Sequence, residues 1–535
     1  MDLRKLVSQI SQRKYQNSVF TFEKGVIVKR SHENLLADIA AACRKLKDWG
    51  VQAGMRVGIL SCNSYEWMVY DVALLELRVL SVAFSDDFAS TSSDQLIEKY
   101  ALSLLLIQNS NAFHKNARNS AAIALLDADK TGITAIRRGI LPADWEFENT
   151  GLVFSSGSSG RLKGLTLNRM GIEASVDAFT KLAGPRPDDC LLLFLPISNF
   201  QQRLMYYSAL WYGFDLIITD PTRLFRALKD LHPTILIAPP MLYEGVETRF
   251  CNLPKIKQRM ARILGGIAGV LPTRALREKV ARTIFKDAYD ALGGRMRFMV
   301  TGMAPIKRST LDFFHLMQLP LFETYGITEF GGVALNVPGA NKPGSVGRLL
   351  PGVRVELAAD GEVIAIRQHR IASTYFECAE GEAEKTFISS DRVATGDVGR
   401  FDDDGYLYLV GRKKEMIVTA GGTKIHPEIL EADIDSCPDV ARSVVFSDPD
   451  TLALAAVVLA RNPADVEAKA RIQQFVESGN DKRPSFTVQH VIFTDEPFSR
   501  ENGFLRPNLK LDRNKIAQHF RLDSRETAAA VGRTA

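Results

Sequence analysis

The sequence predicts an α/β protein with a large first domain and a small second domain. A chain of 535 residues is too long for one compact core. Over residues 1–150, short apolar segments alternate with amphipathic ones, which indicates alternating strands and helices and a largely parallel sheet. A charged, glycine-flanked segment at residues 411–422 is typical of a domain boundary. We expect residues 1–411 to form α/β subdomains with parallel-rich sheets plus a β-rich part. Residues 412–535 are expected to form a small α+β domain.

Hydrophobic periodicity predicts the first elements. Residues 32–49 carry apolar side chains on one helical face, and residues 56–60 form a short apolar run that suits a buried strand. The same two patterns return as a helix over residues 64–77 and a strand over residues 79–84. This repetition is the basis for the predicted parallel sheet.

Four further apolar runs are typical of buried strands: residues 191–196, 214–219, 234–238 and 297–301. In open α/β sheets, ligands collect at the carboxyl ends of the strands. Asn199 and Phe200 follow the first run and are therefore candidate pocket residues. Gly302 follows the last run, where a glycine would let a flat ligand lie against the backbone.

The remaining pattern predicts the β-rich part and the small α+β unit. Residues 353–366 alternate with period two around an Asp-Gly turn, and residues 401–406 mark a second hairpin. The small unit is expected to contain helices over residues 427–434 and 463–478 and strands over residues 440–446 and 452–459.

Composition excludes several classes of protein. The net charge of +5 is small for this length and argues neither for nor against a nucleic-acid partner. We expect no nucleic-acid partner. We find no run of about 18 apolar residues and expect no transmembrane segment. The N-terminus does not resemble a secretory signal, and the six cysteines show no metal-ligand or redox spacing. These features predict a cytoplasmic protein with reduced thiols.

Residues 154–164 form a loop rich in glycine and serine with one lysine. Glycines let the chain curl with its N–H groups pointing inward, and such a nest holds a polyphosphate. A lysine adds a mobile positive charge. The spacing is not that of the Walker motif, and a flexible surface loop is the alternative interpretation. The candidate phosphate ligands are Ser155, Ser156, Gly157, Ser158, Ser159, Gly160 and Lys163.

A second dense group of functional side chains lies at residues 325–329. The ring of Tyr325 suits stacking on a base, the hydroxyl of Thr328 suits a phosphate contact, and the carboxylate of Glu329 suits Mg²⁺. Gly326 stands between them. The alternative is that Glu329 is a helix-cap or surface carboxylate.

Asp397 lies in a glycine-flanked turn, Thr-Gly-Asp, where a carboxylate is able to bind both hydroxyls of a ribose. The alternative is an Asx-turn that serves only the backbone. A basic cluster, Gly-Arg-Lys-Lys-Glu, then begins at Gly411.

These four segments together resemble the adenylate-forming superfamily of acyl-CoA synthetases, peptide-synthetase adenylation domains and luciferases. The motifs stand in the family's order and with similar spacing over nearly the whole chain. Within the superfamily, the sequence looks most like the long-chain acyl-CoA synthetases. That likeness rests on residues 293–297, 301–305 and 501–510.

The resemblance implies a two-step reaction. A carboxylate attacks the α-phosphate of Mg²⁺-bound ATP to give an acyl-adenylate and pyrophosphate, and a thiol then displaces AMP. By analogy, residues 155–163 would bind the β- and γ-phosphates, and Thr328 would contact the α-phosphate. Glu329 would hold Mg²⁺, and Tyr325 would stack on adenine.

The resemblance also assigns roles near the small domain. Asp397 and Arg412 would hold the ribose, and Lys510 would neutralise charge where the carboxylate meets the α-phosphate. Lys414 would be the hinge about which a mobile small domain rotates between the two steps. The segment at residues 421–422 would then approach the thiol.

Three departures from the family pattern indicate a specialised branch. Leu162 precedes Lys163 where the family usually has proline. Asn199 stands where long-chain synthetases commonly have histidine, which leaves the choice of acid open. Residues 80–85 lack the usual glycine and proline.

The leading hypothesis is an ATP-dependent ligase that activates a medium- or long-chain fatty acid and transfers it to CoA. One alternative is an acyl-AMP ligase that loads the phosphopantetheine of an acyl carrier protein. The other is a nucleotide-binding homologue that no longer catalyses.

Overall fold

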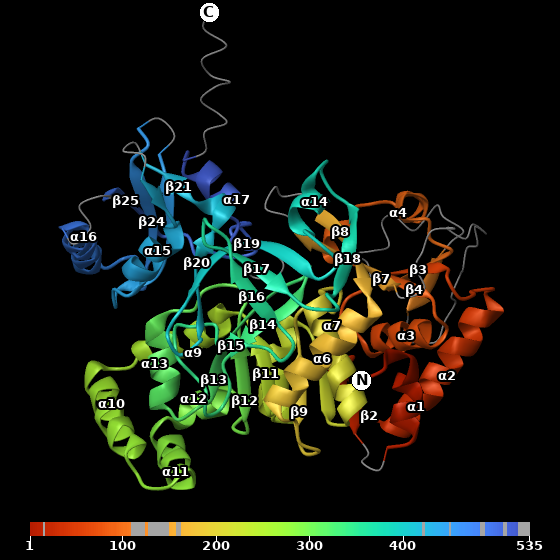
Figure 1. The fold of residues 1–535 in the computed structure, drawn as a ribbon. Coiled ribbons are helices and arrows are strands. Elements are labelled where there is room, and N and C mark those ends of the chain that lie inside the picture. Colours follow the sequence, from red (N-terminus) through yellow and green to blue (C-terminus); the bar gives the residue numbers. More distant parts are fainter. Residues whose placement is uncertain are drawn as a thin grey trace, which may run out of the picture.

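The structure is a computed structural model in which the α/β class expected from the sequence is confirmed (Figure 1). It describes residues 1–13, 17–108, 123–126, 149–156, 162–419, 423–448, 451–481, 487–506 and 511–522. Two large, parallel-rich sheets and the helices packed around them form the main body of the protein. A smaller antiparallel sheet follows them in the chain, and a C-terminal unit has a sheet of its own.

The first large sheet has seven strands in the order β18-β8-β7-β4-β3-β5-β6. Its five central and outer strands from β7 to β6 pair in parallel, and β3 and β4 are buried along their whole length. Continuous apolar runs are typical of strands covered on both faces. The strands are β3 (Arg56–Leu60), β4 (Leu80–Phe84), β5 (Leu104–Gln108), β6 (Ile123–Leu126), β7 (Asn149–Ser156), β8 (Leu162–Asn168) and β18 (Ala372–Glu377).

The second large sheet has nine strands in the order β15-β14-β13-β12-β11-β9-β10-β1-β2. Its centre, from β13 to β1, is parallel, and its two ends are antiparallel. The strands are β1 (Ser18–Glu23), β2 (Val26–Ser31), β9 (Cys190–Leu193), β10 (Asp215–Ile218), β11 (Ile235–Ala238), β12 (Phe298–Thr301), β13 (Leu321–Ile327), β14 (Gly331–Leu335) and β15 (Arg348–Leu349).

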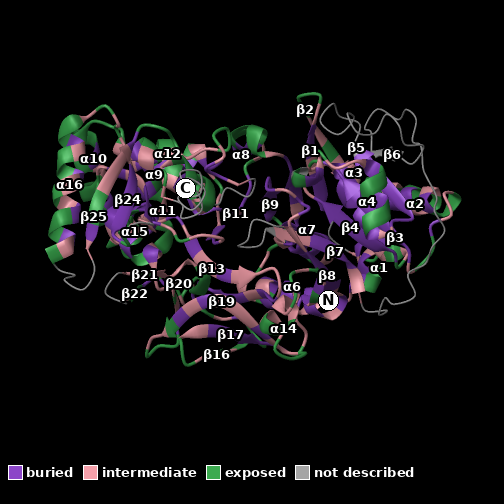
Figure 2. Ribbon diagram, turned by 90° about the horizontal axis from the view of Figure 1, so that it is seen from above, coloured by how far each residue is buried: buried purple, intermediate pink, exposed green. Residues whose placement is uncertain are grey.

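Helices pack between and around the two sheets. The largest apolar core joins both sheets, because Trp67 of α3 and Tyr206 of α7 lie in one cluster with Val57 of β3 and Leu193 of β9. Figure 2 shows much of α3 and the strands beside it as buried. The helices of this part are α1 (Leu6–Ser11), α2 (His32–Asp48), α3 (Tyr65–Glu76), α4 (Ser93–Tyr100), α6 (Arg169–Ala183), α7 (Phe200–Tyr212), α8 (Leu224–Leu231), α9 (Pro240–Cys251), α10 (Lys255–Gly269), α11 (Arg274–Ile284), α12 (Lys286–Ala291), α13 (Arg308–Leu316) and α14 (Glu382–Thr386), with 3-10 turns η1 (Leu3–Lys5), η2 (Asp86–Phe88) and η3 (Pro221–Arg223).

The Gly/Ser-rich segment connects two strands that pair with each other. β7 and β8 pair antiparallel, with Ser155 opposite Lys163. β8 was not predicted from the sequence. The hairpin fixes Ser155 and Lys163 on neighbouring strands of a rigid sheet.

The β-rich part is a four-stranded antiparallel sheet in the order β16-β17-β19-β20. The two hairpins expected around the Asp360-Gly361 turn and residues 401–406 are confirmed, since they join β16 to β17 and β19 to β20. The strands are β16 (Arg354–Leu357), β17 (Glu362–Ile366), β19 (Arg392–Phe401) and β20 (Leu407–Arg412).

The C-terminal unit has its own apolar core, which includes Leu430, Val445, Ala456 and Ile472. The boundary expected between residues 411 and 412 falls at the end of β20. The sequence analysis did not identify the third strand of this unit, β25. The elements are η4 (Lys413–Glu415), β21 (Ile417–Val418), β22 (Lys424–Ile425), α15 (Pro427–Asp435), β23 (Val440–Ser447), β24 (Leu454–Ala460), α16 (Val466–Asp481), β25 (Val488–Thr494) and α17 (Arg513–His519).

A buried ionic contact joins the C-terminal unit to the large part. The ammonium group of Lys307 donates a hydrogen bond of 3.2 Å to the carbonyl oxygen of Val440 and lies 3.9 Å from Asp435. The guanidinium of Arg442 lies 3.2 Å from Asp435 and 3.7 Å from Glu244 of α9. These contacts seat the small unit on α9 and on the start of α13.

No helix among the described residues has the length and apolarity that a membrane crossing requires.

A buried ion pair lies at the centre of the main core. The carboxylate of Asp71 on α3 accepts hydrogen bonds from Arg203 of α7 at 2.5 Å and from the hydroxyl of Tyr207 at 2.6 Å. Both charged side chains are almost fully buried. The Arg203 guanidinium also lies over the rings of Trp67 and Phe200, at 5.4 and 5.8 Å from their centroids.

We predict that Asp71→Ala lowers the free energy of unfolding by about 3–5 kcal/mol, because it leaves the Arg203 charge buried without its counter-ion. Chemical denaturation of the full chain measures this. Asp290→Ala removes one partner of an exposed ion pair with Lys286 and should change stability little. A loss for Asp71→Ala no larger than for this control would contradict the prediction.

Candidate active site

A cleft of ≈ 2980 Å³ runs between the large part and the C-terminal unit. It is lined by the strand ends of β12 and β13, by β19 and β20, and by α9, α15 and α17. Predicted site residues from six separate segments meet there. Those that line the cleft are Ser155, Lys163, Asn199, Gly302, Tyr325, Gly326, Thr328, Glu329, Asp397, Arg412 and Lys414.

Several predicted site residues lie partly or wholly outside the described part of the structure. Gly157, Ser158, Ser159, Gly160 and Lys510 lie outside the described residues, as do residues 421–422. Ser156 is the last residue of β7, and its side chain lies outside the described part of the structure. Their proposed roles therefore remain predictions.

Lys163 lies within a chain of contacts that reaches Glu329. Its ammonium group pairs with the carboxylate of Glu382 on α14 and lies 5.1 Å from the centre of the Tyr375 ring. The hydroxyl of Tyr375 donates a hydrogen bond of 3.0 Å to Glu329. Burial and the nearby Glu329 carboxylate raise the pKa of Tyr375, so this hydroxyl stays a donor at neutral pH. The lysine and the carboxylate therefore lie on one wall of the cleft.

The hinge candidate Lys414 shares a partner with Lys163. Its ammonium group lies 3.7 Å from the same oxygen of Glu382. Burial raises the pKa of Glu382, but the hydrogen bond and the charge of Lys163 outweigh it, and the pKa is lowered overall. Glu382 thus stays ionised between two lysines in a position where phosphate oxygens would compete for them.

Glu329 fits a magnesium ion that is carried in with phosphates. Among the described residues, no group of three or more His, Cys, Asp or Glu side chains is arranged to hold a metal. Mg²⁺ commonly binds through one or two carboxylates and takes its other ligands from substrate phosphates and water. A single carboxylate in the wall of the cleft matches that mode.

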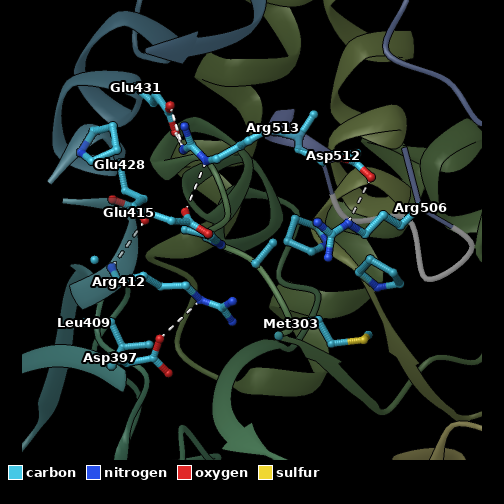
Figure 3. A pocket seen from close by; sticks show the side chains of 18 of the residues that line it. Met303, Asp397, Leu409, Arg412, Glu415, Glu428, Glu431, Arg506, Asp512 and Arg513 are labelled. Atoms are coloured by element: carbon cyan, nitrogen blue, oxygen red, sulfur yellow. Dashed lines mark hydrogen bonds and ion pairs between the residues drawn. The ribbon is translucent and has the colours of Figure 1, made fainter. Parts of the chain in front are cut away.

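Asp397 joins three strands at the floor of the cleft. Its carboxylate accepts a hydrogen bond of 2.7 Å from the hydroxyl of Tyr325 on β13 and lies 3.3 Å from Arg412 on β20. The β19–β20 register places Asp397 directly opposite Arg412. Burial and the Asp397 carboxylate raise the pKa of Tyr325 well above its usual value. Figure 3 shows Arg412 and Asp397 reaching toward each other across the cleft wall.

Two glycines of the site are required by packing. A side chain at Gly326 would lie 2.6 Å from the carbonyl oxygen of Gly331, and one at Gly302 would lie 2.8 Å from Thr324. Next to Gly302, Met303 has a φ of 70°, a strained value for a residue with a side chain, and it faces the cleft (Figure 3). Gly302 therefore allows β12 and β13 to end side by side, where a ligand would rest.

The two acyl-pocket candidates differ in position. Asn199 caps α7 through a 3.4 Å hydrogen bond from the backbone N–H of Gln201, and it lines the cleft. Phe200 is buried in the main core and is not among the residues that line the cleft. The interpretation of Phe200 as a pocket residue is not supported by this structure, because the first turn of α7 directs its ring into the core.

Sequence reasoning missed an ionic cluster on the C-terminal side of the cleft. Arg513 of α17 donates to both oxygens of Glu431 at 2.6 and 2.7 Å and lies 3.1 Å from Glu415 (Figure 3). Glu428 faces the same group, and burial raises its pKa to about 7. Sequence reasoning also missed Glu382 and Tyr375. Apart from Glu415, which ends the basic cluster at residues 411–415, none of these residues belongs to a motif, and only the fold brings them together.

Glu323 gives the cleft a pH-dependent contribution to stability. Its carboxylate accepts a hydrogen bond of 2.6 Å from the backbone N–H of Gly344, yet burial raises its pKa from 4.5 to about 8. Between these two values the unfolded carboxylate ionises while the folded one keeps its proton. Folding therefore loses stability as pH rises through this window, and the loss levels off above it.

We predict that Glu323→Gln raises the Tm relative to the unmodified protein, with a difference that grows from pH 4.5 to pH 8 and is then constant. Glutamine keeps the hydrogen-bond acceptor for Gly344. Thermal unfolding across this pH range measures the difference. Glu278→Gln, on the exposed face of α11, should not reproduce it, and a Tm difference independent of pH would show that Glu323 is not the group responsible.

Comparisons with known proteins identify the family of this chain. The family model described as "AMP-binding enzyme" matches residues 9–376. The long-chain-fatty-acid–CoA ligase FadD15 of Mycobacterium bovis is 27% identical, with 91% of this chain and 90% of that protein aligned. The long-chain-fatty-acid–CoA ligase 1 of Homo sapiens is 25% identical over 87% of this chain and 77% of that protein.

Solved structures show the same fold over almost the whole chain. The anthranilate CoA ligase AuaEII in complex with anthranoyl-AMP superposes with a TM-score of 0.77 at 17% identity, covering 99% of this chain and 98% of that one. ATP-bound MatB from Rhodopseudomonas palustris superposes with a TM-score of 0.74 at 20% identity, covering 97% and 99%. These neighbours share the fold of this chain. The chain belongs to the AMP-binding enzyme family and is an acyl-adenylating, acyl-CoA synthetase-like ligase.

Proposed function

We propose that this enzyme activates a medium- or long-chain fatty acid with ATP and transfers the acyl group to CoA. One observation carries the proposal: Lys163, Glu329 and Asp397, which come from three distant segments, line one cleft. The sequence assigned these three residues to phosphate, metal and ribose. Had they lined separate cavities, no single nucleotide would reach all three.

The first step brings several negative charges together. An oxygen of the substrate carboxylate attacks the α-phosphorus of ATP, the bond to the β-phosphate oxygen breaks, and pyrophosphate leaves. Lys163, with the Gly/Ser-rich turn, would bind the β- and γ-phosphates by exchanging Glu382 for phosphate oxygens. Thr328 would contact the α-phosphate. Lys510 would neutralise charge where the carboxylate and the α-phosphate meet.

The nucleoside would lie over the strand ends. Asp397 and Arg412 would bind the ribose hydroxyls, and Tyr325 with Gly326 would border the adenine. The contacts already made by Asp397 support this role, since Tyr325 and Arg412 fix the orientation of its carboxylate before ligand binds. Mg²⁺ bound at Glu329 would withdraw charge from the phosphates.

The second step would use the small unit. The thiol attacks the acyl carbonyl carbon, and AMP leaves with the bonding electrons. We propose residues 1–411 and 412–535 as the two domains and Lys414 as the hinge. The separate apolar core of the C-terminal unit supports a body able to rotate as a whole, and the thiol would then meet the segment at residues 421–422.

The acid and the acceptor are proposed from the relatives. The fatty-acid–CoA ligases named above support a fatty acid and CoA. Asn199 at the cleft wall, in place of the expected histidine, supports a difference in the shape of the acyl site. Transfer to the phosphopantetheine of an acyl carrier protein is the alternative outcome of the test.

We predict ATP–pyrophosphate exchange that depends on Mg²⁺ and is strongest with a medium- or long-chain fatty acid in a panel of fatty, aryl and hydroxy acids. Asp397→Asn and Lys163→Met should each lower kcat/KM for ATP by at least about 100-fold, because each loses a charged contact to the nucleotide. Asp312→Asn, at an exposed ion pair with Arg308 on the outer part of the cleft, is a control that should retain exchange.

Supplying CoA and a purified carrier protein separately identifies the acceptor. A fatty acyl-CoA product would support the proposal. A thioester formed only with the carrier protein would show that the acceptor is the phosphopantetheine of the carrier protein and not CoA. No exchange with any acid would mean that the chain binds nucleotide without catalysis, and the proposed reaction would then be wrong.

A further inference from the structure

Helix α10 presents its large apolar side chains to solvent. Six of them, which we call the α10 stripe, are between 44 and 83% exposed. The α10 stripe consists of Ile256, Met260, Ile263, Leu264, Ile267 and Val270. Their spacing of three or four residues places them on one face of the helix. A contiguous exposed apolar surface of this kind marks an interaction site.

The opposite face of α10, which packs against the protein, is made of small residues. Gly265 and Ala268 are buried, together with Gln258. A side chain at Gly265 would lie 2.9 Å from Leu316 of α13 and 3.0 Å from Phe285, so only glycine allows this close approach. Gln258 donates hydrogen bonds of 2.7 Å to the carbonyl oxygens of Cys251 and Leu253 and fixes the start of the helix. The outward direction of the stripe is therefore set by packing.

The helices α10 and α11 carry a strong positive charge. Residues 255–286 contain nine lysines and arginines and a single acidic residue, Glu278. On α10 itself the basic residues flank the stripe: at about 100° per residue, Lys257 lies on one side and Arg259 and Arg262 lie on the other. All three are exposed. An apolar stripe between two basic borders is the pattern of a helix that lies in the headgroup region of a membrane.

The positive charge also favours a membrane over other partners that could cover the α10 stripe. A second copy of this chain docked on the same face would bring two strongly basic surfaces together, and the repulsion would oppose burial of the stripe. A nucleic acid would match the charge but would leave the apolar side chains without a partner. An anionic bilayer supplies both the negative headgroups and an apolar layer about 5–10 Å below them.

We infer that the α10–α11 hairpin docks this enzyme on the surface of an anionic membrane through the α10 stripe and its basic border. Figure 1 shows the hairpin at the lower left edge of the molecule, projecting away from the two large sheets. Helix α9, which lines the active-site cleft, leads directly into α10. Docking thus holds the cleft near the bilayer. It does not depend on which acid or acceptor the enzyme uses.

Flotation of the full-length protein with lipid vesicles tests the inference. Vesicles of phosphatidylcholine mixed with phosphatidylglycerol should bind the protein, and phosphatidylcholine alone should bind it far more weakly. Raising the ionic strength from about 0.1 to about 0.5 M should weaken binding, because the headgroup attraction is screened. Absence of binding to the anionic vesicles, or equal binding to both compositions, would overturn the inference.

Amino-acid substitutions test which surface of the protein binds the vesicles. Ile263→Ser with Ile267→Ser should lower the vesicle partition coefficient by more than about tenfold, and Lys257→Glu with Arg262→Glu should do the same on anionic vesicles only. Ile388→Ser with Val466→Ser removes equally exposed apolar side chains elsewhere and should leave binding unchanged. Equal effects of the stripe and control variants would contradict the assignment.

Two control measurements test whether misfolding or dimerisation explains the vesicle results. Because all substituted side chains are exposed, each variant should unfold at the temperature of the unmodified protein. Sedimentation velocity without lipid should show the same mass for the unmodified protein and for Ile263→Ser with Ile267→Ser. A dimer that these substitutions dissociate would assign the stripe to a second copy of the chain and overturn membrane docking.

Discussion

The contact of Asp397 with Tyr325 and Arg412 holds the active-site cleft together. Tyr325 belongs to the nine-stranded sheet, Asp397 to the four-stranded sheet, and Arg412 ends the last strand before the C-terminal unit. Two sheets that share one apolar core therefore meet at one carboxylate, beside the start of the C-terminal unit. Because Asp397 and Tyr325 are buried, their contact keeps its geometry without ligand, and the floor of the cleft is preorganised.

The cleft wall that carries Lys163 and Glu329 is held together by contacts between charged and polar side chains. Glu382 lies between Lys163 and Lys414, and Tyr375 connects this group to Glu329. An acid between two lysines keeps them close before a phosphate arrives, and it also competes with that phosphate. The affinity for ATP then reflects an exchange of one anion for another. Lys414 connects this exchange to the point where the C-terminal unit begins.

The sequence predicts the elements whose signal is local. The strand expected at residues 56–60 is β3 to the residue, and the helix at residues 32–49 matches α2 within one residue, because apolar periodicity and burial coincide there. β8 was missed because it directly follows the Gly/Ser-rich turn and its mixed residues do not form an apolar run. The site motifs were found because each is a compact group with its own chemistry.

Other features of the site depend on contacts that no local pattern records. Lys163 and Glu382 are 219 residues apart, and neither their pairing nor that of Tyr375 with Glu329 has a sequence signal. Phe200 was expected in the pocket because it follows a strand, but its direction depends on the first turn of α7. The α10 stripe is visible as periodicity, yet periodicity does not tell an inward apolar face from an outward one. The small residues beneath it decide that.

A crystal structure of the full chain with ATP and Mg²⁺ tests the central claim most directly, because it shows whether one nucleotide reaches all the converging segments. The account predicts ribose hydroxyls on Asp397, phosphate oxygens on Lys163 in place of Glu382, and the metal ion on Glu329. A nucleotide bound elsewhere, or one that contacts Asp397 while its phosphates point away from Lys163 and Glu329, would contradict it.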